Sequence, residues 1–480
     1  MNYLLDALKQ TKMQDLFWFS GYALYLVFSY MALHSTTVIS SAGVIDYTSS
    51  TLSFIAIISA RVLVFLLVAL FFKQLGRVSS ITAVAVTSGI AITGFLLSGM
   101  VYQFSEQLAL DQMLPWLMLG GFMLGGGDAL ITLLWARFSA LLTIRMVYFY
   151  VLLCNALSLI LYFIVTLIPG SLALPIAAGF FLVSAFFVRK SIDTRPVPSW
   201  EFSRPVFKDA LRRMAHPVIG TSILSFMAGL MLQISGQQEL SLSSFQQTSL
   251  ITSAVAVLLL LLPAFLVKKP LNMGRMYAIA LPLSATGFLL LPIIWNAAGG
   301  IVNSLAQLGA MVAGIILWCM LAETSRDTKL SPFLLFALGL LITNLSQLLG
   351  TVIGFVNAET LQKGDIVLTT VALVAAYLIF MVALFLFKDK SLKGEEEFAH
   401  EESAHTEQYL SKRCALIAEQ KQFTPRESEI FVLLAQGFTI PVISEKLFVS
   451  ENTVKSHVKS IYQKLDVHVR SELIELVNAR

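Results

Sequence analysis

Long apolar runs constrain this chain more than any other feature. A helix that crosses the hydrocarbon core of a bilayer needs about 20 mostly apolar residues. The sequence contains twelve such runs, at 16–33, 52–72, 78–101, 113–136, 144–168, 171–188, 217–235, 247–267, 275–295, 301–322, 333–357 and 366–387. Because lipid leaves backbone polar groups no partner outside the chain, we expect an all-α bundle of twelve transmembrane helices.

Composition divides the chain into a membrane part and a water-soluble part. Of the 480 residues, 57% are hydrophobic and 13% are charged, whereas an ordinary soluble domain has about 25% charged residues. This excludes a wholly soluble or disordered protein. Residues 394–480 nevertheless contain 24 charged residues among 87. We therefore predict a membrane domain over 1–388, a cytoplasmic linker over 389–422 and a soluble domain over 423–480.

Lysine and arginine are unevenly distributed between the connections of the membrane domain. With the N-terminus inside, the inner segments contain 21 of these residues and the outer loops contain Lys363 alone. Short cytoplasmic loops are enriched in Lys and Arg, so both termini are predicted to be cytoplasmic. The longest inner connection, 189–216, separates two six-run halves, 1–188 and 217–388.

This 6+6 arrangement resembles the major facilitator superfamily of transporters. The resemblance covers roughly 1–388 and implies a cavity between the two halves, near the middle of the membrane. Those transporters usually carry a charged, glycine-bearing signature between the second and third helices. Here the loop runs from Phe72 to Val78 and contains no Asp. This departure weakens the expectation of active transport.

Two ionisable residues lie inside predicted spans. Arg61 is in the second run and Asp128 follows three glycines in the fourth. A charge inside the bilayer is costly and usually faces a partner or a cavity. Two interpretations follow: the residues form a buried ion pair that stabilises packing, or they contact a small-molecule ligand, which would be anionic at Arg61. Gly125, Gly126 and Gly127 are typical of tight helix packing.

Enzymatic chemistry is not indicated anywhere in the chain. Cys154, Cys319 and Cys414 form no CxxC pair, so neither a disulfide framework nor a zinc site is predicted. The sequence lacks a nucleophile–base set, a phosphate-binding loop and a metal-ligand cluster. We therefore expect a protein that is not an enzyme and that requires no metal or cofactor.

Four short helices are predicted in the soluble domain. Thr424, followed by Pro425 and Glu427, forms a capping box for the first; Thr439 and Ser450 precede the second and third. The fourth begins near Arg470. The third has an apolar stripe and an opposite face without acidic residues between Asn452 and Leu465, with Thr453, Lys455, Ser456, Lys459 and Gln463 on that face. A helix-turn-helix with such a basic face is suited to the major groove of DNA.

Residues 423–480 resemble the LuxR-type helix-turn-helix domain of bacterial transcription regulators. The matching residues include Thr424-Pro425-Arg426-Glu427, Leu433-Leu434-Ala435-Gln436-Gly437, Val449-Ser450, Thr453-Val454-Lys455, His457, Ile461 and Lys464-Leu465. The resemblance implies base contacts from Lys455, Ser456 and Lys459 and a backbone contact from Thr453. The wider predicted DNA-binding set also includes Thr439, Ser450, Asn452 and His457.

The same resemblance implies dimerisation through the fourth helix, with Leu473, Ile474 and Val477 as the contacting residues. The domain departs from the family pattern at three positions. Ser456 replaces an apolar residue that is common in some members, and Pro441 and Val442 replace a polar pair at the start of the second helix.

These observations predict a membrane-embedded one-component transcription regulator in the bacterial cytoplasmic (inner) membrane. Its membrane domain would sense a small molecule, and its C-terminal domain would bind promoter DNA as a homodimer. RNA polymerase would be a further partner if the regulator is an activator. Two alternatives remain: a transporter that carries a regulatory DNA-binding domain, and a regulator whose membrane part is only an anchor. One span would suffice for an anchor.

Overall fold

The computed structural model describes residues 13–34, 47–76, 78–103, 110–168, 170–193, 200, 202–236, 250–261, 273–294, 301–357, 366–387, 413–435, 438–447, 449–467, 472–473 and 477. Within these ranges the regular secondary structure is helical. The chain forms two compact units, Met1–Leu392 and Lys393–Arg480. Each unit is described by itself.

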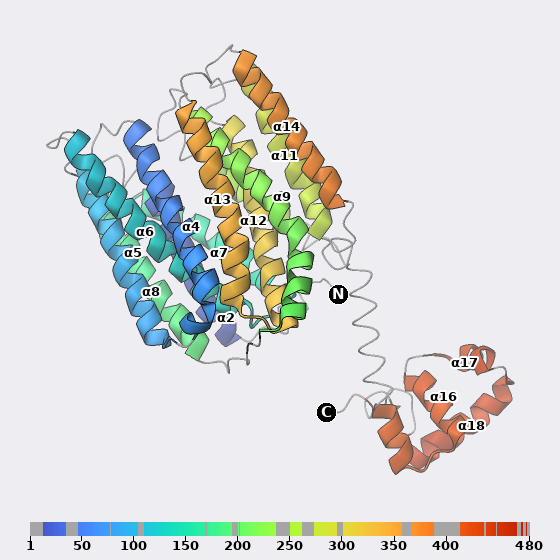
Figure 1. The fold of residues 1–480 in the computed structure, drawn as a ribbon. Coiled ribbons are helices and arrows are strands. Elements are labelled where there is room, and N and C mark those ends of the chain that lie inside the picture. The colour runs from blue at the N-terminus through green and yellow to red at the C-terminus, as the bar shows by residue number, and fades with distance from the viewer. Residues whose placement is uncertain are drawn as a thin grey trace. The chain divides into compact units, whose positions relative to one another are not determined.

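Every predicted apolar run overlaps a helix of the first unit (Figure 1). The N-terminal half contains α2 (Met13–His34), α4 (Tyr47–Leu75), α5 (Ser80–Gln103), α6 (Leu110–Ser139), α7 (Ile144–Thr166) and α8 (Gly170–Asp193). The C-terminal half contains α9 (Arg204–Gly236), the helix Leu250–Leu261, α11 (Met273–Ile294), α12 (Ile301–Thr328), α13 (Pro332–Val356) and α14 (Ile366–Phe387).

Eight helices of the described residues are long and apolar enough to cross a membrane. They are α4 to α9, α12 and α13, so the chain is a multi-pass membrane protein. The other four contain shorter apolar segments within the described ranges. The total of twelve spans therefore stays a prediction.

Much of the connection 189–216 is helical, although it lies outside the predicted spans. Helix α8 continues to Asp193, and α9 begins at Arg204, 13 residues before the predicted span. Pro205 lies in the first turn of α9, where the missing N–H of proline has no intrahelical partner to lose. The basic residues after it are good helix formers, so the helix extends beyond the apolar run.

Within each half the helices pack against one another, and helices of the two halves also contact each other. In the N-terminal half α4 packs against α6, α5 against α6, and α2 against α7 and α8. In the C-terminal half α9 packs against α12 and α13, and α11 against α12 and α14. Helix α4 contacts α13 and α7 contacts α12, so these pairs join the halves.

Small residues allow the closest of these contacts. A Cβ atom on Gly125 would collide with the backbone of Ile57 on α4, and one on Gly350 would collide with the backbone of Phe226 on α9. By contrast, Gly179 has no heavy atom within 4 Å of an added Cβ. The tight helix packing predicted at Gly125 is therefore confirmed.

The second unit has a hydrophobic core of its own. It contains a helix over 413–420, α16 (Pro425–Ala435), α17 (Ile440–Leu447) and α18 (Glu451–Leu465). Residues 472, 473 and 477 are helical, and Ile474 lies outside the described residues. The core is formed by Cys414, Ile430, Phe431, Leu434, Ile443, Val454, Val458, Ile461, Leu465, Val467, Leu473 and Val477. The predicted apolar stripe of α18 is thus its buried face.

Candidate functional site

Helix α18 presents a polar, basic face that its core contacts hold in place. Val454, Val458, Ile461 and Leu465 are buried, and their spacing of three and four residues fixes which side of the helix points outward. The exposed residues of α18 are Glu451, Asn452, Thr453, Lys455, Ser456, Lys459 and Gln463, whereas His457 is half-buried. The structure therefore brings most of the predicted DNA-contact residues onto one surface.

The start of α18 is defined by a side-chain cap. The hydroxyl of Ser450 accepts a hydrogen bond from the backbone N–H of Thr453 at 3.2 Å, and the two hydroxyls lie 2.8 Å apart. Both side chains are exposed, as is Thr439, which directly precedes α17. Such caps satisfy N–H groups that a helix terminus leaves unpaired. The cap fixes where the exposed lysine face begins.

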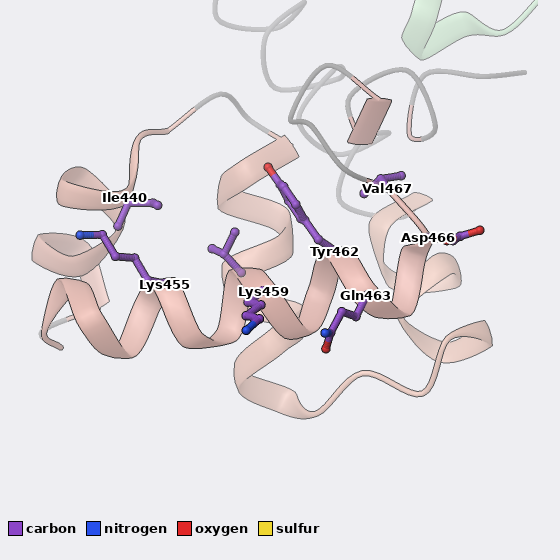
Figure 2. Close-up of a pocket in the computed structure, with 8 residues that line it drawn as sticks. Ile440, Lys455, Lys459, Tyr462, Gln463, Asp466 and Val467 are labelled. Carbon is purple, nitrogen blue, oxygen red and sulfur yellow. The ribbon is translucent and has the colours of Figure 1, made fainter.

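Helix α17 and helix α18 flank a shallow groove of about 520 Å³ (Figure 2). Lys455, Lys459 and Gln463 line it from α18, at the i, i+4 and i+8 spacing of one helix face. Ile440 lines it from the first turn of α17. The remaining lining residues are Val458, Tyr462, Asp466 and Val467. Two cations and an amide thus face an open surface, which suits hydrogen bonding to base edges and phosphates.

The carboxylate of Glu427 joins α16 to α18. Glu427 accepts hydrogen bonds from Lys464 at 2.7 Å and from Ser460 at 2.5 Å. Its other contacts close the predicted capping box: Thr424 N–H donates to Glu427 at 2.8 Å, and Glu427 N–H donates to the Thr424 hydroxyl at 3.2 Å. Burial favours a higher pKa for this carboxyl, but the hydrogen bonds from Lys464, Ser460 and Thr424 outweigh it and lower the pKa to about 2.

Sequence reasoning missed two features of this surface. Glu451, the first residue of α18, lies 3.7 Å from Lys455, and the side chains are 50% and 58% exposed, respectively. The i, i+4 spacing is a signal that could have identified this pair. Arg426 donates to the carbonyl of Leu447 at 2.9 Å and so connects α16 to the end of α17. The departures at Pro441 and Val442 leave α17 intact, and both residues are exposed.

Two of the predicted dimer residues, Leu473 and Val477, are buried in the core of the domain. Leu473 is 0% exposed and Val477 is 2% exposed, and both belong to the core of their own domain. Ile474 lies outside the described residues. Leu473 and Val477 are therefore core residues in this structure, and dimerisation through the fourth helix stays a prediction.

The membrane unit contains the predicted charge pair, together with a residue that the sequence did not single out. Arg61 Nε lies 3.4 Å from Asp128 Oδ2, with side-chain exposures of 23% and 7%. The hydroxyl of Tyr25 donates to Asp128 Oδ1 at 2.7 Å and lies 2.8 Å from the hydroxyl of Thr132. The cluster joins α2, α4 and α6. A tyrosine hydroxyl deep in an apolar run needs a partner, which is the signal that could have identified Tyr25.

The C-terminal unit contains a helix-turn-helix formed by α17 and α18. Residues 421–477 match the family described as bacterial regulatory proteins, luxR family. The chain is 45% identical over 51 residues to the spore germination protein GerE of Bacillus subtilis (strain 168), a match that covers 11% of this chain and 69% of GerE. The chain belongs to the luxR family of bacterial regulatory proteins.

Two further relatives match over a segment of similar length. The transcriptional regulatory protein DegU of Brevibacillus brevis is 41% identical over 51 residues, and the match covers 11% of this chain and 22% of DegU. The uncharacterized transcriptional regulatory protein YxjL of Bacillus subtilis (strain 168) is 46% identical over 52 residues, or 24% of its length. The chain thus spans less than a quarter of these two relatives.

The membrane unit shares its fold with solved transporters. The major facilitator superfamily proton:xylose symporter XylE matches with a TM-score of 0.52 at 13% identity, over 78% of this chain and 95% of that chain. A bacterial homologue of the iron transporter ferroportin, in an outward-facing state, matches with a TM-score of 0.50 at 14% identity, over 78% and 98%. At these identities the likeness concerns the fold alone.

Proposed function

We propose that this chain is a membrane-embedded one-component regulator that couples a small molecule to promoter binding. It would lie in the bacterial cytoplasmic membrane with both termini in the cytoplasm, where DNA is accessible. The observation that carries the proposal is the exposed Lys455–Lys459 face of α18 in a luxR-family domain, on a chain whose described residues include eight helices able to span a membrane.

The geometry of α18 suggests how DNA would be bound. Lys455 and Lys459 are one helical turn apart and exposed, so both can donate to guanine O6 and N7 or to phosphates. Asn452 can pair with adenine through its amide, and Thr453 can donate to a backbone phosphate. Residues 423–480 contain seven basic and seven acidic residues. With zero net charge, one copy would bind weakly, so specific binding requires a dimer.

A chromatin immunoprecipitation experiment on the full chain tests the DNA assignment. Lys455→Ala/Lys459→Ala removes both exposed cations of α18 without touching the core. The matched control, Lys329→Ala/Lys421→Ala, removes the same charge at exposed positions outside α18. We expect loss of promoter enrichment in the first variant only, at equal membrane abundance. Equal enrichment in both variants contradicts the recognition-helix assignment.

The cluster around Arg61 and Asp128 is the proposed sensing element. In this structure the two charges compensate each other, and Tyr25 and Thr132 complete the polar environment. An anionic small molecule that binds Arg61 would compete with Asp128 and so favour a different arrangement of α2, α4 and α6. A ligand shifts such an equilibrium only through its differential affinity for the two arrangements.

Transcript profiling of a deletion strain, with and without candidate small molecules, identifies responsive promoters for testing this cluster. Arg61→Leu/Asp128→Leu removes both charges and avoids leaving one of them buried without its partner. If the cluster binds ligand, the variant loses its response to the inducer while promoter occupancy persists. If the variant responds normally to the inducer, Arg61 and Asp128 stabilise helix packing and do not bind the ligand.

A transporter that carries a regulatory DNA-binding domain is the second candidate. It is favoured by the fold that the membrane unit shares with XylE and the ferroportin homologue. Substrate flux in proteoliposomes would distinguish it from a receptor, which binds its ligand without net movement. If the regulator activates transcription, RNA polymerase would be the further partner at the promoter.

A further inference from the structure

Helix α9 is too long to be contained in the bilayer core. Its 33 residues extend about 50 Å at a rise of 1.5 Å per residue. The hydrocarbon core is about 30 Å thick, and about 40–45 Å including both headgroup layers. The predicted span begins near Pro217, so residues 204–216 lie outside the hydrocarbon core and extend about 20 Å from it, through the headgroup layer.

These first three turns have two distinct faces. Ala210 and Met214, four residues apart, are buried at 0% and 3% exposure. The opposite face carries Arg204, Lys208 and Arg212 at successive intervals of four residues, and all three are exposed. One side of the segment therefore packs on the protein, and a row of cations points away from it.

At the end of α4, Lys73 contacts Phe202, and the two residues add a fourth cation and an aromatic side chain to this face. Lys73 Nζ lies 5.4 Å from the ring centroid of Phe202, the residue two positions before α9. The Phe202 ring is 5.9 Å from that of Phe72 and 5.5 Å from that of Phe207. Lys73 is exposed, and Phe202 is 42% exposed. The end of α4 and the start of α9 thus form one surface.

The charge of this surface is largely uncompensated. Within the described part of the chain, no carboxylate lies within ion-pair distance of Lys73, Arg204, Lys208 or Arg212. The carboxylate of Asp209 accepts from Arg213 at 2.9 Å instead. We call Lys73, Phe202, Arg204, Lys208, Leu211 and Arg212 the α9 basic face.

We propose that the α9 basic face binds the headgroups of anionic phospholipids. The four cations lie in the headgroup layer and just beyond it, where the negative surface potential of such lipids attracts Lys and Arg. The exposed side chains of Phe202 and Leu211, at 42% and 41%, can enter the boundary of the acyl chains, as apolar residues of interfacial helices do. A DNA backbone would offer these two side chains no apolar partner. The proposal does not depend on the regulatory function.

Lipid titration of the full-length protein in a zwitterionic detergent tests this assignment. The readout is the thermal unfolding midpoint during addition of phosphatidylglycerol, with phosphatidylcholine and a random duplex as comparison ligands. The test variant is Lys208→Gln/Arg212→Gln, whose two side chains are exposed. The control variant, Lys329→Gln/Lys421→Gln, loses the same charge at exposed positions outside the α9 basic face. The midpoints without lipid check that both variants fold.

We expect phosphatidylglycerol to stabilise the wild type and the control at lower concentrations than phosphatidylcholine does. The test variant should require about tenfold more phosphatidylglycerol for half-maximal stabilisation, since each cation contributes measurably to attraction by an anionic surface. Equal titration of both variants, no preference over phosphatidylcholine, or a larger effect of the random duplex would each overturn the proposal.

Discussion

Glu427 offers a quantitative test of how the DNA-binding domain is held together. Its carboxylate is 5% exposed and accepts hydrogen bonds from Lys464 on α18 and from the backbone of Thr424 before α16. The substitution Glu427→Gln preserves the size of the side chain and removes its charge. It therefore weakens the contact that joins α16 to α18.

The magnitude follows from the pKa of the carboxyl. The pKa is about 2 in the folded protein, compared with an ordinary value of 4.5. At about 1.4 kcal/mol per pKa unit this difference corresponds to at most about 3.5 kcal/mol of stability near neutral pH. Because the folded pKa is the lower one, this stability is present above about pH 4.5. It is lost progressively as the pH falls toward 2.

Urea unfolding of the unit 393–480 at pH 7 and at pH 3 measures this contribution. We expect Glu427→Gln to lower the free energy of unfolding by about 2–3 kcal/mol at pH 7, and by clearly less at pH 3. Glu429→Gln is the matched control on the same helix, because Glu429 is 54% exposed and pairs with Arg426 at the surface. Such exposed pairs contribute about 0–1 kcal/mol. Equal losses in the two variants, or a loss independent of pH, would refute the reasoning.

Three further predictions concern packing and burial. Gly125→Ala should lower the thermal unfolding midpoint of the full chain because its Cβ meets the backbone of Ile57, whereas Gly179→Ala, with open space around it, should leave it unchanged or raise it. In the unit 393–480, burial raises the pKa of the Cys414 thiol to about 11, so an alkylating reagent at pH 8 should modify it only as the domain unfolds in urea. Leu473→Ala should destabilise that unit by about 2–5 kcal/mol in denaturant unfolding; a change in oligomeric state at unchanged stability would instead assign Leu473 to a dimer surface.

Several features of the fold and the DNA-binding surface were predictable because they depend on neighbours in sequence. Apolar runs of about 20 residues indicate membrane helices, and the described helices overlap each run. The caps at Thr424 and Ser450 are formed with residues three positions later. The exposed position of Lys455 and Lys459 follows from the helical period and from the apolar stripe behind them.

Long-range partners were not predictable in this way. Tyr25 bonds to Asp128 across 103 positions of sequence, and Lys464 reaches Glu427 across 37. Neither pair leaves a periodic signal. The inward placement of Leu473 and Val477 was also missed, since an apolar stripe on a short helix fits its own core and a partner's surface equally well.

Helix periodicity, apolar length and capping act over a few residues, so the amino-acid sequence is enough to predict a helical membrane protein with a luxR-type domain. The cluster of Arg61 and Asp128 with Tyr25, and the core positions of Leu473 and Val477, emerge instead from the folded chain. Those outcomes depend on which helix faces meet, and that is set by the packing of the whole chain.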